Sequence, residues 1–380
     1  MSDRPWLSAY PEGVPADIDV QAYSSLVQLL EQAFQRFGPR VAFSFMGQEL
    51  SYAQLDAQSR ALAAYLQSLG LVRGDRVAIM LPNVLQYPIA VAAVLRAGYV
   101  VVNVNPLYTA RELQHQLQDS GAKAIVIIEN FAATLASCLA QTPIEHVVLC
   151  AMGDRLGLIK GAIVNHVVRK VKKLVPPFQL PRATRFNQAL ALGAGKTLHP
   201  PSLGPDDLAV LQYTGGTTGV SKGAELLHRN IIANVIQSEV WNAPAMKQVP
   251  EHEQPTNVCA LPLYHIFAFT VNMMLSMRTG GKSILIPNPR DIPAVLKELY
   301  SSSLAVEQLA YKDRPFFAML PKDEENGGKY IPQPTIYDDG AGDSMDFATA
   351  QANQQNANNV QFRLTGKTTH GVATLTGDAI

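Results

Sequence analysis

The sequence predicts an α/β protein in which parallel-rich sheets are covered by helices, followed by an extended, β-rich tail. Two long segments carry apolar residues at helical spacing, and short β-branched runs alternate with helical patterns up to about residue 300. That alternation is absent after Ser301, Ser302 and Ser303, where Pro-punctuated extended pieces and an Asn/Gln-rich stretch begin. We therefore expect one domain over residues 1–300 and an unrelated tail over residues 301–380.

The first helices are expected at residues 24–38 and 53–70, because both segments end on glycine, which readily adopts the left-handed conformation that closes a helix. Strand-like runs that are apolar on both faces lie at residues 76–81, 100–104, 124–128 and 146–149. Strands with two apolar faces are typical of a parallel sheet that is covered on both sides by helices.

The net charge and the cysteine content limit which partners the chain can bind and in which compartment it works. The formal net charge is zero, so an overall electrostatic attraction to nucleic acid is excluded and no nucleic-acid partner is expected. The widely separated Cys138, Cys150 and Cys259 form no CxxC pair, which favours a reducing compartment over a disulfide framework. The acidic, Pro-rich start shows no secretory signal, and a cytoplasmic location is expected.

Two uncharged stretches, residues 77–95 and 259–277, are long enough to raise the question of a membrane span. Pro82 and Pro88 interrupt the first stretch, and Pro262 interrupts the second. We predict that both are core elements of the α/β domain.

Residues 159–175 predict an amphipathic helix with a basic surface, which Pro176 and Pro177 terminate. The apolar stripe comprises Ile163, Val164, Val167, Val168, Val171 and Leu174. The basic residues elsewhere on the helix are Lys160, Arg169, Lys170, Lys172 and Lys173. Such a helix can lie peripherally on an anionic membrane, or it can be a surface helix that the stripe docks on the core; the sequence favours the second interpretation.

The densest chemical signal is the segment LAVLQYTGGTTGVSKG at residues 208–223. An apolar run leads into a turn rich in glycine, threonine and serine, with one lysine. Polyphosphate binding needs backbone amides that can approach closely, hydroxyl donors and a cation, and this segment supplies all of them. It is neither a Walker A loop nor GxGxxG. A flexible Ser/Thr/Gly connection is the alternative.

YTGGTTGVSKGA resembles the phosphate loop of the adenylate-forming superfamily, and its surroundings resemble bacterial long-chain fatty acyl-CoA synthetases. The supporting passages are LPNVLQYPIAVAAVLRAGYVVVNVNPLYTARELQHQLQDSGAKAIV, LHRNIIANV, LPLYHIFAFTVN and NPRDIPAVLKEL. The resemblance implies an enzyme that joins a fatty acid to coenzyme A through an acyl-adenylate, with ATP and Mg²⁺ as cofactors.

Carried over by position, the resemblance implies a phosphate-wrapping loop and a nearby cation, Lys222. The loop residues are Thr214, Gly215, Gly216, Thr217, Thr218 and Gly219. It also implies that His265 lies beside the acyl-adenylate as a catalytic residue, with Tyr264 and Phe267 shaping the acyl pocket. Without the resemblance, a lone histidine among apolar residues is more often a hydrogen-bonded core histidine.

Several family motifs are missing from the sequence. No Tyr-Gly-x-Thr-Glu occurs, so the glutamate that holds Mg²⁺ in the family has no counterpart, and no protein ligand for a metal is predicted. We therefore expect a catalytically incomplete ligase. The tail phrases DRPFFAMLPKDEENGGKYIPQP and FATAQANQQNANN resemble tailed-phage major capsid proteins. The second hypothesis is accordingly an assembly protein that self-associates through residues 301–380 and carries the α/β body as a passenger.

Overall fold

The computed structural model describes residues 4–214, 221–247 and 253–287, together with strands within residues 318–379. Contacts between Cα atoms divide the chain into two units, Met1–Ile292 and Pro293–Ile380. The expected boundary at Ser301–Ser303 lies outside the described residues, so its position stays a prediction.

The body is built on a seven-stranded sheet with the order β7-β6-β5-β3-β4-β8-β9. Its strands are β3 (Arg76–Met80), β4 (Val100–Asn103), β5 (Ala124–Ile128), β6 (His146–Cys150), β7 (Thr184–Arg185), β8 (Leu208–Thr214) and β9 (Lys222–Leu227). Neighbouring strands run parallel from β7 to β8, and only the β8–β9 pair is antiparallel. The predicted parallel-rich sheet is confirmed, and β3, β4, β5 and β6 begin and end within one residue of the bounds expected for them.

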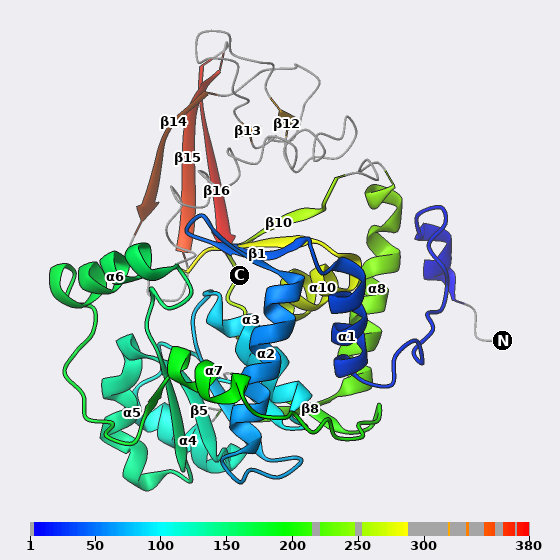
Figure 1. Cartoon of the computed structure of the whole chain (residues 1–380). Coiled ribbons are helices and arrows are strands. Elements are labelled where there is room, and N and C mark those ends of the chain that lie inside the picture. The colour runs from blue at the N-terminus through cyan, green and yellow to red at the C-terminus, as the bar shows by residue number, and fades with distance from the viewer. Residues whose placement is uncertain are drawn as a thin grey trace. The chain divides into compact units, whose positions relative to one another are not determined.

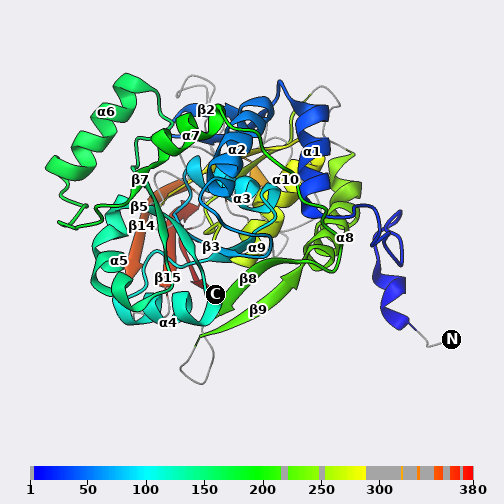
Figure 2. The same cartoon turned by 60° about the horizontal axis from the view of Figure 1, so that its bottom comes forward.

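Helices cover both faces of this sheet (Figures 1 and 2). They are α1 (Leu26–Phe37), α2 (Tyr52–Gln67), α3 (Gln86–Arg96), α4 (Ala110–Ser120), α5 (Ala132–Cys138), α7 (Phe186–Ala194) and α8 (His228–Met246). In Figure 2, α2, α3 and α7 lie on one side of the sheet and α4 and α5 on the other. Both faces need a cover because successive side chains of a strand point to opposite faces and are apolar on each. In β3, Val77 and Ile79 belong to the core beneath α1–α3, whereas Ala78 and Met80 belong to the core beneath α4 and α5.

A second sheet has the order β10-β11-β1-β2. Its strands are β1 (Val41–Phe45), β2 (Gln48–Ser51), β10 (Thr256–Cys259) and β11 (Lys282–Leu285). Tyr52 begins α2 directly after β2, and the single proton of its buried hydroxyl is shared between the carbonyls of Ser276 (2.9 Å) and Gly281 (2.7 Å). This side chain therefore fixes α2 to the segment that leads into β11.

Both uncharged stretches are core elements, as predicted. The first forms β3 and α3, and every residue of α3 is buried. The second forms the end of β10, the short helix α9 (Ile266–Ala268), a π-helical segment η5 (Phe269–Leu275) and α10 (Ser276–Thr279). Within the described residues, we find no helix that combines the length and the hydropathy of a membrane span.

Helix α6 (Leu158–His166) continues into the π-helical segment η4 (Val167–Val171), so the predicted helix forms. Docking by the apolar stripe is confirmed only in part, because Val164 packs against the core and Val168 is buried, whereas other members of the stripe are exposed. Ile163, Val171 and Leu174 are 59%, 65% and 52% exposed, and Val168 is the one member of the stripe that is buried. The helix also approaches the body through Gly161, a contact that the positions of large apolar residues do not reveal.

The tail contains the expected strands. A three-stranded antiparallel sheet comprises β14 (Asp346–Asn353), β15 (Val360–Thr368) and β16 (Gly371–Ala379). A short antiparallel pair joins β12 (Ala318–Met319) to β13 (Pro332–Gln333). The predicted β-rich character of the tail is thus confirmed for the residues that are described there.

Candidate nucleotide and acyl site

The segment predicted to bind phosphates is a β-hairpin at the edge of the seven-stranded sheet. Thr214, the last residue of β8, pairs with Lys222, the first residue of β9. Directly paired residues of an antiparallel hairpin place their side chains on the same face. Both residues are exposed, so the hairpin presents a threonine and a lysine to solvent at the base of the glycine-rich turn.

Residues 215–220 lie outside the described part of the chain, and with them the predicted phosphate contacts of Gly215, Gly216, Thr217, Thr218 and Gly219. Ser221, the first described residue after the turn, is hydrogen-bonded both to β8 and to α4. The Ser221 hydroxyl donates to the Thr214 carbonyl at 2.9 Å. His115 Nε2 of α4 lies 3.1 Å from the Ser221 carbonyl. Both ends of the glycine-rich turn are therefore fixed to the sheet and to α4.

Gly223 has a packing role that the glycine count of the motif concealed. It pairs with Tyr213 across the hairpin, and a Cβ at Gly223 would lie 2.9 Å from the tyrosine ring. The Tyr213 hydroxyl donates to Asp119 at 2.6 Å. Burial and the Asp119 carboxylate together raise the pKa of Tyr213 well above its usual value. Gly223 is thus required by a tyrosine that joins the hairpin to α4.

A buried polar network lies at the carboxyl ends of β4 and β8. Asn103, the last residue of β4, donates from Nδ2 to Gln212 Oε1 of β8 at 3.1 Å. Its Oδ1 accepts a hydrogen bond from the Tyr87 hydroxyl at 2.7 Å, and its carbonyl accepts one from Gln116 Nε2 at 2.8 Å. Ligands of parallel α/β sheets bind beyond the carboxyl ends of the strands, which is where this network lies.

The network extends to the loop that carries Tyr264 and His265. Gln212 Nε2 donates to the Tyr264 carbonyl at 3.1 Å. The Tyr87 hydroxyl oxygen lies 2.7 Å from the Leu263 carbonyl oxygen, so its single proton is shared between this carbonyl and Asn103 Oδ1. The strand that enters the glycine-rich turn is thereby fastened to the predicted acyl loop. Since Gln212 precedes Thr214 by two residues, two motifs far apart in the sequence meet at one edge of the sheet.

Asn83 holds the same loop from the opposite side. It is 3% exposed, and its amide donates to the carbonyls of Cys259 (3.0 Å) and Leu261 (2.9 Å). Its side-chain oxygen accepts from the Leu263 backbone N–H at 2.8 Å. One amide side chain therefore sets the course of the loop immediately before Tyr264.

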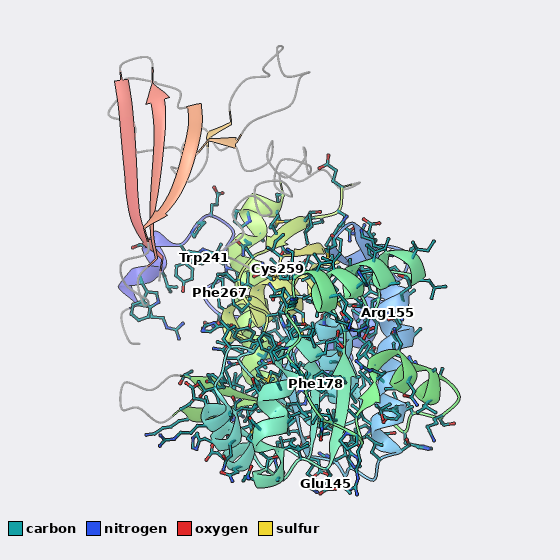
Figure 3. The ribbon with its side chains drawn as sticks, turned by 90° about the vertical axis from the view of Figure 1, so that its left-hand side faces the viewer. Glu145, Arg155, Phe178, Trp241, Cys259 and Phe267 are labelled. Carbon is teal, nitrogen blue, oxygen red and sulfur yellow. The ribbon has the colours of Figure 1, made fainter. Side chains whose placement is uncertain are left out.

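The predicted acyl residues differ in exposure. His265 is exposed, Tyr264 is half-buried, and Phe267 is 56% exposed. The interpretation of His265 as a buried core histidine is therefore excluded. Burial, with a smaller contribution from Tyr108, raises the pKa of Tyr264, so its hydroxyl stays protonated at neutral pH. In Figure 3, Phe267 and Trp241 of α8 lie on the same side of the body.

The described residues offer no built metal site. Among residues 4–214, 221–247 and 253–287, no group of three or more His, Cys, Asp or Glu could hold a metal ion. The buried thiols are poor ligands as well, because burial raises the pKa of Cys150 and, to about 12, that of Cys259.

Sequence reasoning missed the residues that join the two motifs. They are Asn83, Tyr87, Asn103, His115, Gln116 and Gln212. A signal was present for Asn103 and Gln212, because each is an amide within an otherwise apolar strand. A buried amide needs hydrogen-bond partners, so such a residue marks a point where strands are joined to something polar.

Comparison with known proteins agrees with this geometry. A family model described as AMP-binding enzyme matches residues 30–303. The chain belongs to the AMP-binding enzyme family.

Within this family, the chain is similar to long-chain-fatty-acid–CoA ligases. It is 52% identical to that of Escherichia coli O6:H1 over 295 residues, covering 77% of this chain and 52% of the relative. It is 33% identical to that of Bacillus subtilis, covering 75% of this chain and 50% of the relative. The chain thus spans about half the length of the curated relatives it matches.

Solved structures show the same fold. A long-chain-fatty-acid–CoA ligase from Archaeoglobus fulgidus superposes with a TM-score of 0.60 at 21% identity, covering 77% of this chain and 52% of that one. The A domain of a carboxylic acid reductase from Segniliparus rugosus, in complex with AMP and a carboxylic acid, superposes with a TM-score of 0.57 at 18% identity, covering 74% and 47%. The match to the family model ends at residue 303, so the capsid resemblance of the tail stays a prediction.

Proposed function

We propose that the body of this chain is the nucleotide-phosphate-binding and acyl-binding part of a long-chain fatty acid–CoA ligase, which uses ATP to activate a fatty acid for transfer to coenzyme A. The observation that carries the proposal is the bond from Gln212 to the Tyr264 carbonyl. It joins the strand that enters the glycine-rich turn to the loop that holds the acyl-site candidates. The names of the similar proteins support the choice of a long-chain fatty acid as the acyl group.

The proposed chemistry is limited by charge, because a fatty carboxylate must approach a polyphosphate. In this proposal the amides and hydroxyls of residues 214–219 surround the β- and γ-phosphates, and the exposed ammonium of Lys222 lies beside them. Mg²⁺, bound together with ATP, supplies further neutralisation of the phosphate oxygens. The fixed ends of the turn reduce the reorganisation that binding would otherwise require.

The loop after β10 supplies the acyl side. His265 is exposed beside half-buried Tyr264, and it can donate a hydrogen bond to an oxygen of the acyl-adenylate. Phe267 offers an exposed aromatic face that a long acyl chain can cover. Because Asn83 and Tyr87 bind this loop through its backbone, the side chains that face the substrate remain free to vary with the acyl group.

Nucleotide binding tests the phosphate half of the proposal. Titration calorimetry of the full chain with ATP and Mg²⁺ is expected to show binding that Lys222→Ala combined with Thr217→Ala weakens by at least about tenfold, since a charge-assisted hydrogen bond contributes about 1.5–3 kcal/mol. The matched control is Lys196→Ala with Thr197→Ala, an exposed lysine and threonine on the connection after α7. Equal affinities for the two double variants would remove the assignment.

Fatty-acid binding tests the acyl half. Phe267→Ala is expected to weaken palmitate binding by about tenfold, because it removes most of an aromatic contact area, while ATP affinity stays unchanged. Leu192→Ala, which shortens a side chain of α7 that is 47% exposed, is the control. A loss of ATP affinity equal to the loss of palmitate affinity would indicate that Phe267 supports the fold and not the acyl site.

A further inference from the structure

One exposed surface of the body has no place in the proposed ligase site. We name it the α6 face. It comprises the apolar side chains Leu158, Ile159, Ile163, Val171 and Leu174 and the exposed basic side chains Lys170, Lys172 and Lys173. Leu158 and Ile159 are 94% and 79% exposed, which is more than any other large apolar side chain in the described part of the chain. In Figures 1 and 2, α6 lies at the margin of the body.

The orientation of the helix follows from how it is docked. A Cβ at Gly161 would lie 2.4 Å from the Gly153 carbonyl oxygen, so two backbones meet there without side chains between them. The Gly153 N–H donates to Asn165 Oδ1 at 2.7 Å. Gly161, Asn165 and buried Val168 follow one another at helical spacing and form the inward side. Ile159 and Ile163 are consequently turned outward.

An ion pair between Arg169 and the buried Glu129 fixes the end of the helical segment. Arg169 donates from Nε and an Nη atom to both carboxylate oxygens of Glu129, at 2.6 Å and 2.8 Å. The Glu129 side chain is 2% exposed and also pairs with Arg185. This anchor turns Arg169 inward and leaves Lys170, Lys172 and Lys173 in solvent. The face is therefore held rigidly and is not a frayed end of the chain.

The charge around the face has one sign. Although the whole chain is neutral, residues 158–174 contain five Lys or Arg residues and no Asp or Glu, and Glu129, which pairs with Arg169, is buried. A second copy of this chain would bring lysines against lysines if the two faces met, which is unfavourable. A surface that presents apolar and cationic groups together matches the boundary between anionic headgroups and acyl chains.

We propose that the α6 face docks on an anionic phospholipid bilayer, with Leu158, Ile159 and Ile163 inserted at the headgroup boundary and the three lysines against lipid phosphates. The inference does not depend on the ligase activity. If the proposed function also holds, docking would place the body where long-chain fatty acids partition.

Vesicle flotation of the full chain tests the proposal. We expect binding to phosphatidylcholine vesicles that contain phosphatidylserine and weak binding to phosphatidylcholine alone. Binding should be lost as NaCl is raised from about 0.1 M to about 1 M, because the Debye length then falls from about 10 Å to about 3 Å and the lysine charges are screened. Replacement of Lys170, Lys172 and Lys173 by alanine is expected to lower the affinity on the order of 100-fold, at roughly fivefold per lysine. Ile159→Ser with Ile163→Ser is expected to lower it by at least about tenfold.

Matched controls separate this face from exposure and charge in general. Arg111→Ala, Arg182→Ala and Lys196→Ala remove the same charge from other exposed positions. Val72→Ser with Leu107→Ser removes exposed apolar side chains that are 62% and 72% exposed. Flotation equal to that of the unaltered chain is expected for both controls. Equal flotation of the α6-face variants and the control variants would overturn the proposal. A dimer that sediments without lipid and that Ile163→Ser dissociates would also overturn it, because the face would then bind a second copy of the chain.

Discussion

Asn83 gives the sharpest test of how the candidate acyl loop is held. Asn83→Ala removes three hydrogen bonds to the loop: those to the carbonyls of Cys259 and Leu261 and that from the Leu263 N–H. Each bond contributes about 1 kcal/mol net, and buried groups left without a partner cost more. Three lost bonds at this value give an expected loss of about 3 kcal/mol of the free energy of unfolding.

Urea unfolding followed by circular dichroism measures this loss. Asn242→Ala is the matched control, because Asn242 is exposed and its amide makes one hydrogen bond, to the Ser238 carbonyl within α8. We expect the control to change stability by less than about 0.5 kcal/mol. An Asn83→Ala loss no larger than that of the control would refute the reasoning that this side chain positions the loop.

The remaining predictions concern the body. Burial lowers the pKa of His228 to about 4, so between pH 6.5 and 4 the unfolded state binds a proton that the native state does not. The free energy of unfolding should therefore fall by about 3 kcal/mol as the pH is lowered from 6.5 to 4. The same pH dependence in His228→Gln as in the unaltered chain would contradict this. Gly193→Ala should cost about 2 kcal/mol in urea unfolding, since its Cβ would lie 1.8 Å from the Ala61 carbonyl oxygen, whereas Gly195→Ala, with open space around it, should cost little. Arg96→Met should lower the free energy of unfolding by about 3 kcal/mol, because it removes a buried guanidinium that binds Glu31, Asp56 and Ser59, and Arg60 alone would then pair with the two carboxylates. A loss no larger than that of Arg60→Met, where the arginine is half-exposed, would show that the buried guanidinium is dispensable.

The sequence predicted the sheet and the first helices well because their signals are periodic and local. The run of apolar residues in β3 and the helical spacing of the apolar residues in α1 need no distant partner to be recognised. The two uncharged stretches were also interpreted correctly, since proline interrupts each of them.

The errors and omissions have a common cause, which is that they depend on contacts between distant residues. The stripe on α6 predicted docking through all of its apolar side chains, but only Val164 and Val168 pack on the body, beside a close approach of Gly153 and Gly161 that no periodicity shows. Likewise, the sequence places Gly223 in the glycine-rich segment 208–223, but only the structure shows that it packs against Tyr213. Gln212 could have been singled out as an amide in a strand, but its partners could not.

The central claim is that the end of the β8–β9 hairpin binds the phosphates of a nucleotide. Comparing the affinities of the unaltered chain and of Lys222→Ala for ATP and for adenosine tests it most directly. The account predicts that the substitution weakens ATP binding by about tenfold and leaves adenosine binding unchanged, because Lys222 would contact phosphate oxygens only. Equal changes for both ligands, or no change for either, would contradict it.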